Sequence, residues 1–295
     1  MTRLRRSELS TPGSNERMIE KAAASAADLV FLDLEDSVAA PEKPAAREKS
    51  VAALRDLDWG RKTRAVRVNA PGSDWIEADL ETVVRGAAAL DVVIVPKVRS
   101  GADVRAVDRR LEALERGLGR TVPIGLEVLV EEVESLAAVE EIATSSPRLE
   151  ALIFGSGDMA ASQGVRTHWL REYPGDPWIY HRSRIVVAAR AAGLSAIDGP
   201  YWGPIEDLAG YGEECRQVST LGYAGKWAIH PAQIDVANET FSPTRDELEH
   251  ARRIVGAYGD AAARGQGAIR LDGVMVDAVD LRLAERLLEA QQRLQ

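Results

Sequence analysis

The chain has 295 residues, 45% of them hydrophobic, and a formal net charge of −9, which suits one large folded domain. The acidic balance, with no basic cluster longer than that from Arg3 to Arg6, argues against nucleic-acid binding. No apolar run approaches the roughly 20 residues that cross a bilayer, no signal-peptide core follows the basic N-terminus, and Cys215 is the only cysteine, so we expect a cytoplasmic protein without a membrane partner.

Short apolar runs alternate with amphipathic helical segments along most of the chain. Seven of the runs end in a polar or charged residue, and successive ends lie 28 to 40 residues apart, the length of one strand, one crossover helix and two loops. The run at residues 5–13 supplies one more strand. In chain order the seven runs end at Asp33, Asn69, Lys97, Glu127, Asp158, Asp198 and His230. This pattern predicts an α/β fold, a (β/α)8 TIM barrel with its site where the strands end.

Residues 1–240 form the predicted barrel, because a boundary within them would interrupt the alternation. Residues 241–295 form a predicted C-terminal helical extension or lid, with helices over 244–263 and 278–294 around a Gly- and Ala-rich stretch. The segment 164–182 is too long and aromatic for a minimal connection, and it favours either a lid over the site or an oligomer contact.

Two carboxylates from neighbouring predicted strands are candidate metal ligands. Glu127 ends the fifth strand and Asp158 follows the sixth, so both side chains face the same end of the barrel. Magnesium is commonly held by one or two carboxylates, with water or substrate oxygens in the other positions. The alternative is that these acids cap loops or pair with arginines.

The acidic run DLED ends the second predicted strand. Glu35 and Asp36 could hold metal-bound water or pair with Arg67 or Lys97, whereas Asp33, between apolar neighbours, favours a structural role. A solvated acidic loop is the alternative for all three acids.

Arg67 and Lys97 are candidate cations for an anionic partner. Arg67 stands between valines, where a buried guanidinium needs a fixed anionic or carbonyl partner. That partner could be a substrate, or it could be Glu127 or the DLED acids. The partner of Lys97 is open in the same way. The sequence around Lys97 favours an electrostatic role for its ammonium over a covalent one.

The ordered motifs of the chain resemble those of a known family. The motifs are STPGSNERMIEKA, DLEDSV, VRVN, PK, LE followed by a helix, FGSGDMA, DGP and GKWAIHPAQI. Together they are similar to the citrate lyase β-subunit-like family, and to its malyl-CoA and β-methylmalyl-CoA lyase branch in particular. The C-terminal MVDAVDLRLAERLL resembles an element of that family whose aspartate serves catalysis, and Asp277 occupies its position.

The resemblance implies a carbon–carbon lyase that reversibly cleaves a 3-hydroxyacyl-CoA, such as malyl-CoA or β-methylmalyl-CoA, into acyl-CoA and a glyoxylate-like 2-oxo acid. It implies Mg²⁺, with Mn²⁺ as the alternative ion, held by Glu127 and Asp158, with Arg67 stabilising the enolate and Asp277 moving the proton. It also implies a homotrimer or homohexamer in which the C-terminal segment reaches a neighbouring subunit. The candidate contacts to coenzyme A are Arg6, Lys21 and Lys97.

Four other functions stay open at this stage. They are malyl-CoA thioester hydrolysis, a citrate lyase β-like or citramalyl-CoA lyase activity, a pyruvate-type aldolase acting on free keto acids, and a non-catalytic barrel subunit.

Overall fold

The structure, a computed structural model, describes residues 3–168, 173, 175–263 and 265–294. It divides into two compact units, Met1–Asn238 and Glu239–Gln295. Part of the segment 164–182, for which the sequence predicts a lid or an oligomer contact, lies outside the described residues at 169–172 and 174. Within the described part of the chain, no helix is long and apolar enough to cross a membrane.

The first unit contains a closed barrel of eight parallel strands, and the predicted fold class is confirmed. Each strand pairs with the next in the chain, and β1 pairs with β8 to close the ring. The strands are β1 (Ser7–Pro12), β2 (Leu29–Asp33), β3 (Thr63–Arg67), β4 (Val92–Val95), β5 (Gly125–Val130), β6 (Leu149–Phe154), β7 (Ser195–Asp198) and β8 (Gly225–Ala228).

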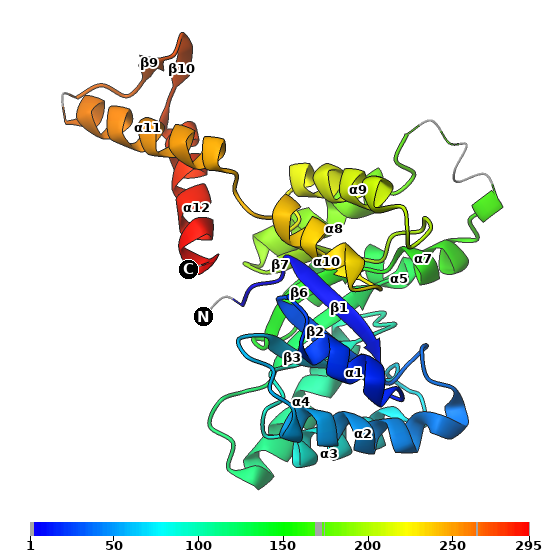
Figure 1. Cartoon of the computed structure of the whole chain (residues 1–295). Coiled ribbons are helices and arrows are strands. Elements are labelled where there is room, and N and C mark those ends of the chain that lie inside the picture. The colour runs from blue at the N-terminus through cyan, green and yellow to red at the C-terminus, as the bar shows by residue number, and fades with distance from the viewer. Residues whose placement is uncertain (1–2, 169–172, 174, 264, 295) are drawn as a thin grey trace. The chain divides into compact units, whose positions relative to one another are not determined.

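Helices follow the strands and cover the outside of the barrel, and α2 and α3 lie side by side there (Figure 1). The helices of this part are α1 (Glu16–Ala23), η1 (Ala40–Glu42), α2 (Lys43–Asp56), α3 (Ile76–Gly86), α4 (Gly101–Leu118), α5 (Val133–Ala137), α6 (Val139–Ala143), α7 (Ser156–Gln163), α8 (Ile179–Ala191), α9 (Leu208–Leu221) and α10 (Ala232–Thr240). Between β5 and β6 the chain forms the two short helices α5 and α6 in place of one longer helix.

Local sequence explains where α4 starts and stops. Ser100 and Asp103 form a reciprocal capping box at the start of α4, and Gly119 ends that helix with a φ of 65°, a conformation that glycine adopts without the clash of a Cβ.

The barrel interior is apolar at mid-height. Alternate residues of each strand point inward, and those at this level form one buried cluster. Its members are Leu29, Phe31, Ala65, Val92, Ile94, Leu129, Ala151, Ile153, Ile197 and Trp227. The inward positions next along the strands lie at the carboxyl end of the barrel, and three of them carry charge.

The second unit has a small core of its own. Helices α11 (Arg245–Ala262) and α12 (Ala278–Leu294) pack together with the antiparallel hairpin of β9 (Ile269–Leu271) and β10 (Val274–Val276) (Figure 1). Ala251, Ile254, Val276 and Ala284 are its buried residues. Thr244 and Glu247 cap the start of α11 reciprocally.

Candidate active site

Three charged side chains occupy inward positions at the carboxyl end of the barrel. Asp33 and Arg67 are the last residues of β2 and β3, two positions after the buried Phe31 and Ala65. Glu131 directly follows β5 and stands two positions after the buried Leu129. Because inward positions recur every second residue, strand periodicity places all three side chains in the mouth of the barrel.

Glu131 is a buried carboxyl surrounded by other negative charge. Its residue is 2% exposed, and its Oε1 accepts a hydrogen bond from the Lys97 backbone N–H at 2.7 Å. Burial, then the charge of Asp158, then that of Glu35 raise the pKa of Glu131 to about 8. A Cβ at Gly155 would stand 2.5 Å from the Cβ and Oε2 of Glu131, so only glycine leaves room for this side chain. Gly155 therefore leaves space for the Glu131 carboxyl. The neighbouring groups do not fully offset its negative charge.

Asp158 lies in the first turn of α7, directly above the end of β6, and its side chain is 40% exposed. Its Oδ1 is 3.9 Å from the Lys97 ammonium. Asp158 and Glu131 thus form the carboxylate pair from neighbouring strands that the sequence predicts for this end of the barrel, with Glu131 in the place expected for Glu127.

Lys97 connects the acids of the second strand to this pair. Its Nζ donates to Glu35 Oε1 at 2.6 Å and to Asp36 Oδ1 at 3.1 Å, and these bonds raise the pKa of Lys97 although partial burial opposes them. Its φ of 50° is rare for a residue with a side chain, and this backbone aims its N–H at Glu131. The predicted electrostatic role of Lys97 is consistent with these contacts.

Arg67 is held by two carboxylates. Its Nε and Nη2 donate to the two oxygens of Asp33, each at 2.7 Å, and its Nη1 is 3.1 Å from Glu35 Oε2. The residue is 8% exposed and faces the mouth. The expected pairing of Arg67 with DLED acids is found, and Glu127 is not among its partners in the described structure.

Glu127 does not lie beside Asp158. It points into the barrel below the apolar layer, is fully buried, and accepts a hydrogen bond from Arg5 Nε at 2.7 Å. Arg5 also lies 3.9 Å from Glu8, and burial followed by the charge of Glu127 raises the pKa of Glu8 well above its usual range. The prediction that the fifth strand ends at Glu127 is wrong, because β5 continues for three more residues and ends at Val130.

Glu131 was therefore missed, although the sequence carries a signal for it. All six residues of GLEVLV are buried, and the next residue is Glu131. If the strand runs to the end of this apolar stretch and Glu127 points inward, the next inward residues are Leu129 and Glu131. That pattern indicates Glu131 as the residue at the mouth of the barrel.

Arg6 and Lys21 lie away from the acids. Arg6 precedes β1 and makes two hydrogen bonds through its side chain to Asp28, just before β2, so it lies at the amino end of the barrel. Lys21 is exposed in the last turn of α1, which leads back from the end of β1 to the start of β2. The structure thus does not bring these predicted coenzyme A contacts to the acid cluster.

The acid pair suits a hard divalent cation with few protein ligands. Among the described residues, no group of three or more His, Cys, Asp or Glu side chains could hold a metal ion. Magnesium commonly takes only one or two carboxylates and fills its other positions with water and substrate oxygens. Burial comes first among the causes that raise the pKa of Glu131, and the negative charge of Asp158 comes next, so the two carboxylates act on the same space. Glu131 and Asp158 therefore fit Mg²⁺ or Mn²⁺.

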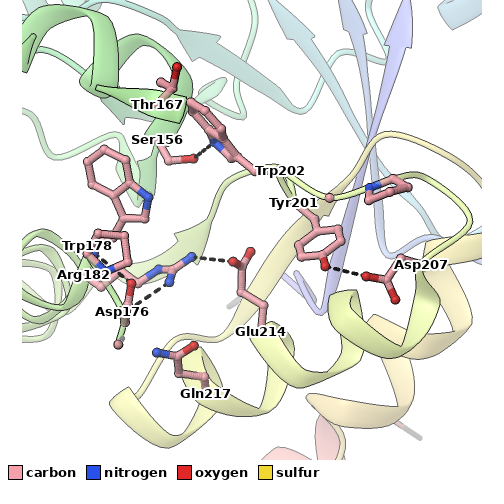
Figure 2. Close-up of a pocket in the computed structure, with 14 residues that line it drawn as sticks. Ser156, Thr167, Asp176, Trp178, Arg182, Tyr201, Trp202, Asp207, Glu214 and Gln217 are labelled. Carbon is pink, nitrogen blue, oxygen red and sulfur yellow. Dashed lines mark hydrogen bonds and ion pairs between the residues drawn. The ribbon is translucent and has the colours of Figure 1, made fainter. Parts of the chain in front are cut away.

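A hollow of about 630 Å³ has Ser156, the first residue of α7, on its wall. Figure 2 shows Trp202 on its wall, with its indole N–H donating to Ser156 Oγ at 2.7 Å. Arg182 and Glu214 also line the hollow and form an ion pair, with Nη2 and Oε2 3.4 Å apart. A hollow of this size accommodates a small organic ligand.

Asp277 belongs to the second unit and precedes α12. Its Oδ1 accepts a hydrogen bond from Val279 N at 2.7 Å, and its backbone N–H donates to Asp280 Oδ2 at 2.8 Å. Four exposed apolar residues lie near it in the sequence: Val274, Met275, Val279 and Leu283.

Comparisons with known proteins agree over most of the chain. Residues 6–231 match the HpcH/HpaI aldolase/citrate lyase family. The chain is 42% identical over 294 residues to an L-malyl-CoA/β-methylmalyl-CoA lyase of Cereibacter sphaeroides, covering 95% of this chain and 92% of the relative. It is 38% identical to the citrate lyase subunit beta of Escherichia coli K12, covering 94% and 89%.

A solved structure shares the fold along the full length. CitE from Mycobacterium tuberculosis, solved in complex with magnesium, acetoacetate and coenzyme A, superposes with a TM-score of 0.77 at 32% identity and covers 97% of both chains. With the barrel and these similarities together, the chain belongs to the HpcH/HpaI aldolase/citrate lyase family, as its motifs predict.

Proposed function

We propose that this chain is a magnesium-dependent carbon–carbon lyase that reversibly cleaves a 3-hydroxyacyl-CoA, such as malyl-CoA or β-methylmalyl-CoA, into an acyl-CoA and glyoxylate. The observation that carries the proposal is the buried, poorly compensated Glu131 beside Asp158, two carboxylates suited to a divalent ion at the mouth of the barrel. The similarity to L-malyl-CoA/β-methylmalyl-CoA lyases over 95% of the chain supports the choice of substrate.

Glu131 and Asp158 would hold the ion, with Glu35 and Asp36 binding its water ligands. When bound, the ion acts as a Lewis acid that orients the substrate and polarises the oxygen that becomes the glyoxylate carbonyl. The protein's own side chains would supply the two other functions, stabilising the anion and transferring the proton.

Arg67 would stabilise the acyl-CoA enolate left by carbon–carbon bond cleavage. The guanidinium is buried, and Asp33 fixes its orientation on one side. Donors held in place before the reaction stabilise developing charge without reorganising during it.

Asp277 would move the proton to or from the acyl α-carbon. A carboxylate is suited to this transfer when it reaches the carbon in the assembled site. We further propose that Asp277 reaches the barrel of a neighbouring subunit in a homotrimer or homohexamer. The exposed Val274, Met275, Val279 and Leu283 would form part of the subunit contact, because such apolar groups near one another are typical of interfaces.

Incubation of the protein with malyl-CoA and Mg²⁺ tests the reaction. Acetyl-CoA and glyoxylate are the expected products, and chelation by EDTA should stop their formation. Release of free malate with coenzyme A would instead indicate thioester hydrolysis, and cleavage of free keto acids would indicate an aldolase.

A mixing experiment tests the shared site. The Asp277→Asn and Arg67→Ala variants should each lack cleavage activity, while Asp277→Asn should still bind Mg²⁺ in calorimetry. If the two are unfolded, mixed in equal amounts and refolded, random assembly would place an intact Arg67 beside an intact partner aspartate in about a quarter of the sites. Recovery of activity only in the mixture supports a shared site, and no recovery despite mixed oligomers would contradict it.

A further inference from the structure

The carboxylate of Asp33 accepts four hydrogen bonds from two different segments. Its Oδ1 accepts from Arg67 Nε at 2.7 Å and from the Glu35 backbone N–H at 3.0 Å. Its Oδ2 accepts from Arg67 Nη2 at 2.7 Å and from the Ser37 backbone N–H at 3.1 Å. Asp33 is fully buried, and although burial opposes the charged form, these donors hold the pKa of Asp33 below its usual range. Both oxygens of an ionised carboxylate are thus used fully.

The first pair of bonds fixes the plane of the Arg67 guanidinium. A bidentate contact sets both the position and the rotation of the planar fork, which a single bond would not do. Phe31 and Trp227 lie under it, with ring centroids 6.0 and 5.6 Å from Arg67 Cζ. The remaining edge, Nη1, faces Glu35 at the mouth.

The second pair of bonds fixes the loop that carries Glu35 and Asp36. The buried Lys43 ammonium adds to this restraint, because it donates to the carbonyl oxygens of Leu34 and Glu35, each at 2.7 Å. The loop is therefore tied to the same carboxylate that orients Arg67.

We propose that Asp33 is a positioning residue that sets Arg67, and through the loop Glu35 and Asp36, in the geometry needed for cleavage. The sequence alone favoured a purely structural role for Asp33. The proposal rests on the proposed lyase function, since it concerns the orientation of the group that stabilises the enolate. Asp33 itself does not need to touch the substrate.

The Asp33→Asn variant tests this role, because an amide presents its NH₂ group to donors and cannot accept from both sides. We expect kcat for malyl-CoA cleavage to fall about 10- to 100-fold, while KM and the Kd for Mg²⁺ measured by calorimetry each change by less than about threefold. In an Arg67→Lys background, which already lacks the bidentate contact, Asp33→Asn should lower kcat by a clearly smaller factor than with Arg67 present, because only its effect through the loop of Glu35 and Asp36 remains.

The Asp91→Asn variant is a matched control. Asp91 makes a bidentate contact of the same kind with Arg64, three residues before Arg67 on the same strand, and it lies at the amino end of the barrel. Its loss should leave kcat unchanged per folded molecule. If Asp33→Asn does not fold, Asp33→Glu keeps the charge but displaces the carboxylate by one methylene, and the same fall in kcat is expected.

Two results would overturn the inference. One is an unchanged kcat in folded Asp33→Asn or Asp33→Glu, and the other is a fall that is equally large with Arg67 and with Arg67→Lys. If wild-type protein and the Asp91→Asn control both fail to cleave malyl-CoA, the proposed function fails instead.

Discussion

Glu131→Gln should stabilise the metal-free protein, and increasingly so as the pH rises. The pKa of Glu131 is raised from 4.5 to about 8 in the folded chain, so folding favours its protonated form. The folded state keeps a proton that the unfolded state has already lost between these two values. The stability from this group is therefore complete below pH 4.5 and declines as the pH rises towards 8.

The size of the effect follows from linkage. At about 1.4 kcal/mol per pKa unit, wild-type protein should lose roughly 3–4 kcal/mol of unfolding free energy from this one group between pH 5 and pH 8. Glutamine has no such proton to lose. The difference in unfolding free energy between Glu131→Gln and wild type should therefore grow by about that amount over the same range.

Urea denaturation in EDTA at several pH values measures this difference. Glu134→Gln, an exposed glutamate in the following helix α5, is the control and should track wild type at every pH. Saturating Mg²⁺ should then stabilise wild type but not Glu131→Gln. A difference between variant and wild type that stays constant within about 1 kcal/mol from pH 5 to pH 8 would refute the reasoning.

Three further substitutions probe the same region and its support. Gly155→Ala places a Cβ 2.5 Å from Glu131 and should weaken Mg²⁺ binding by about tenfold or more, as measured by calorimetry. Gly157→Ala is the control, because open space surrounds its Cβ, and it should bind Mg²⁺ as wild type does. Equal affinities in the two variants would contradict the close fit of Glu131 against Gly155. Arg5→Met leaves buried carboxylates without their cation and should cost about 3–5 kcal/mol in chemical denaturation, with Mg²⁺ affinity kept; a cost below about 1 kcal/mol would be inconsistent with that burial. Lys97→Gly should be about 1–2 kcal/mol more stable than Lys97→Ala in thermal denaturation, because the native φ of 50° favours glycine, and the reverse order would exclude strain at this residue.

The sequence predicts the fold well because alternation is a local signal. Each strand and helix is visible as a short apolar run or an amphipathic segment, and the right-handed parallel connection leaves few arrangements for eight such units. The acids and cations of DLED, Arg67, Lys97 and Asp158 come to one end of the barrel because each follows or ends a strand.

Contacts between elements are harder to predict from periodicity alone. Glu127 is polar inside an apolar run and thus resembles a strand end, but its inward position is compensated by Arg5, 122 residues away in the chain. No residue near Glu127 in the sequence indicates that Arg5 is its partner. Similarly, the lowered pKa of Asp33 and its positioning contacts depend on Arg67 of the next strand. The residues around Asp33 in the sequence do not predict that Arg67 is its partner.

The ion pair of Arg5 with Glu127, together with Glu8, occupies the amino end of the barrel interior. These charged groups and the apolar layer above them fill the amino end of the barrel. Reactants and products therefore enter and leave only at the carboxyl end. A departing acyl-CoA must then leave along the path by which the next substrate arrives, and free acyl-CoA should compete directly with incoming thioester for the enzyme.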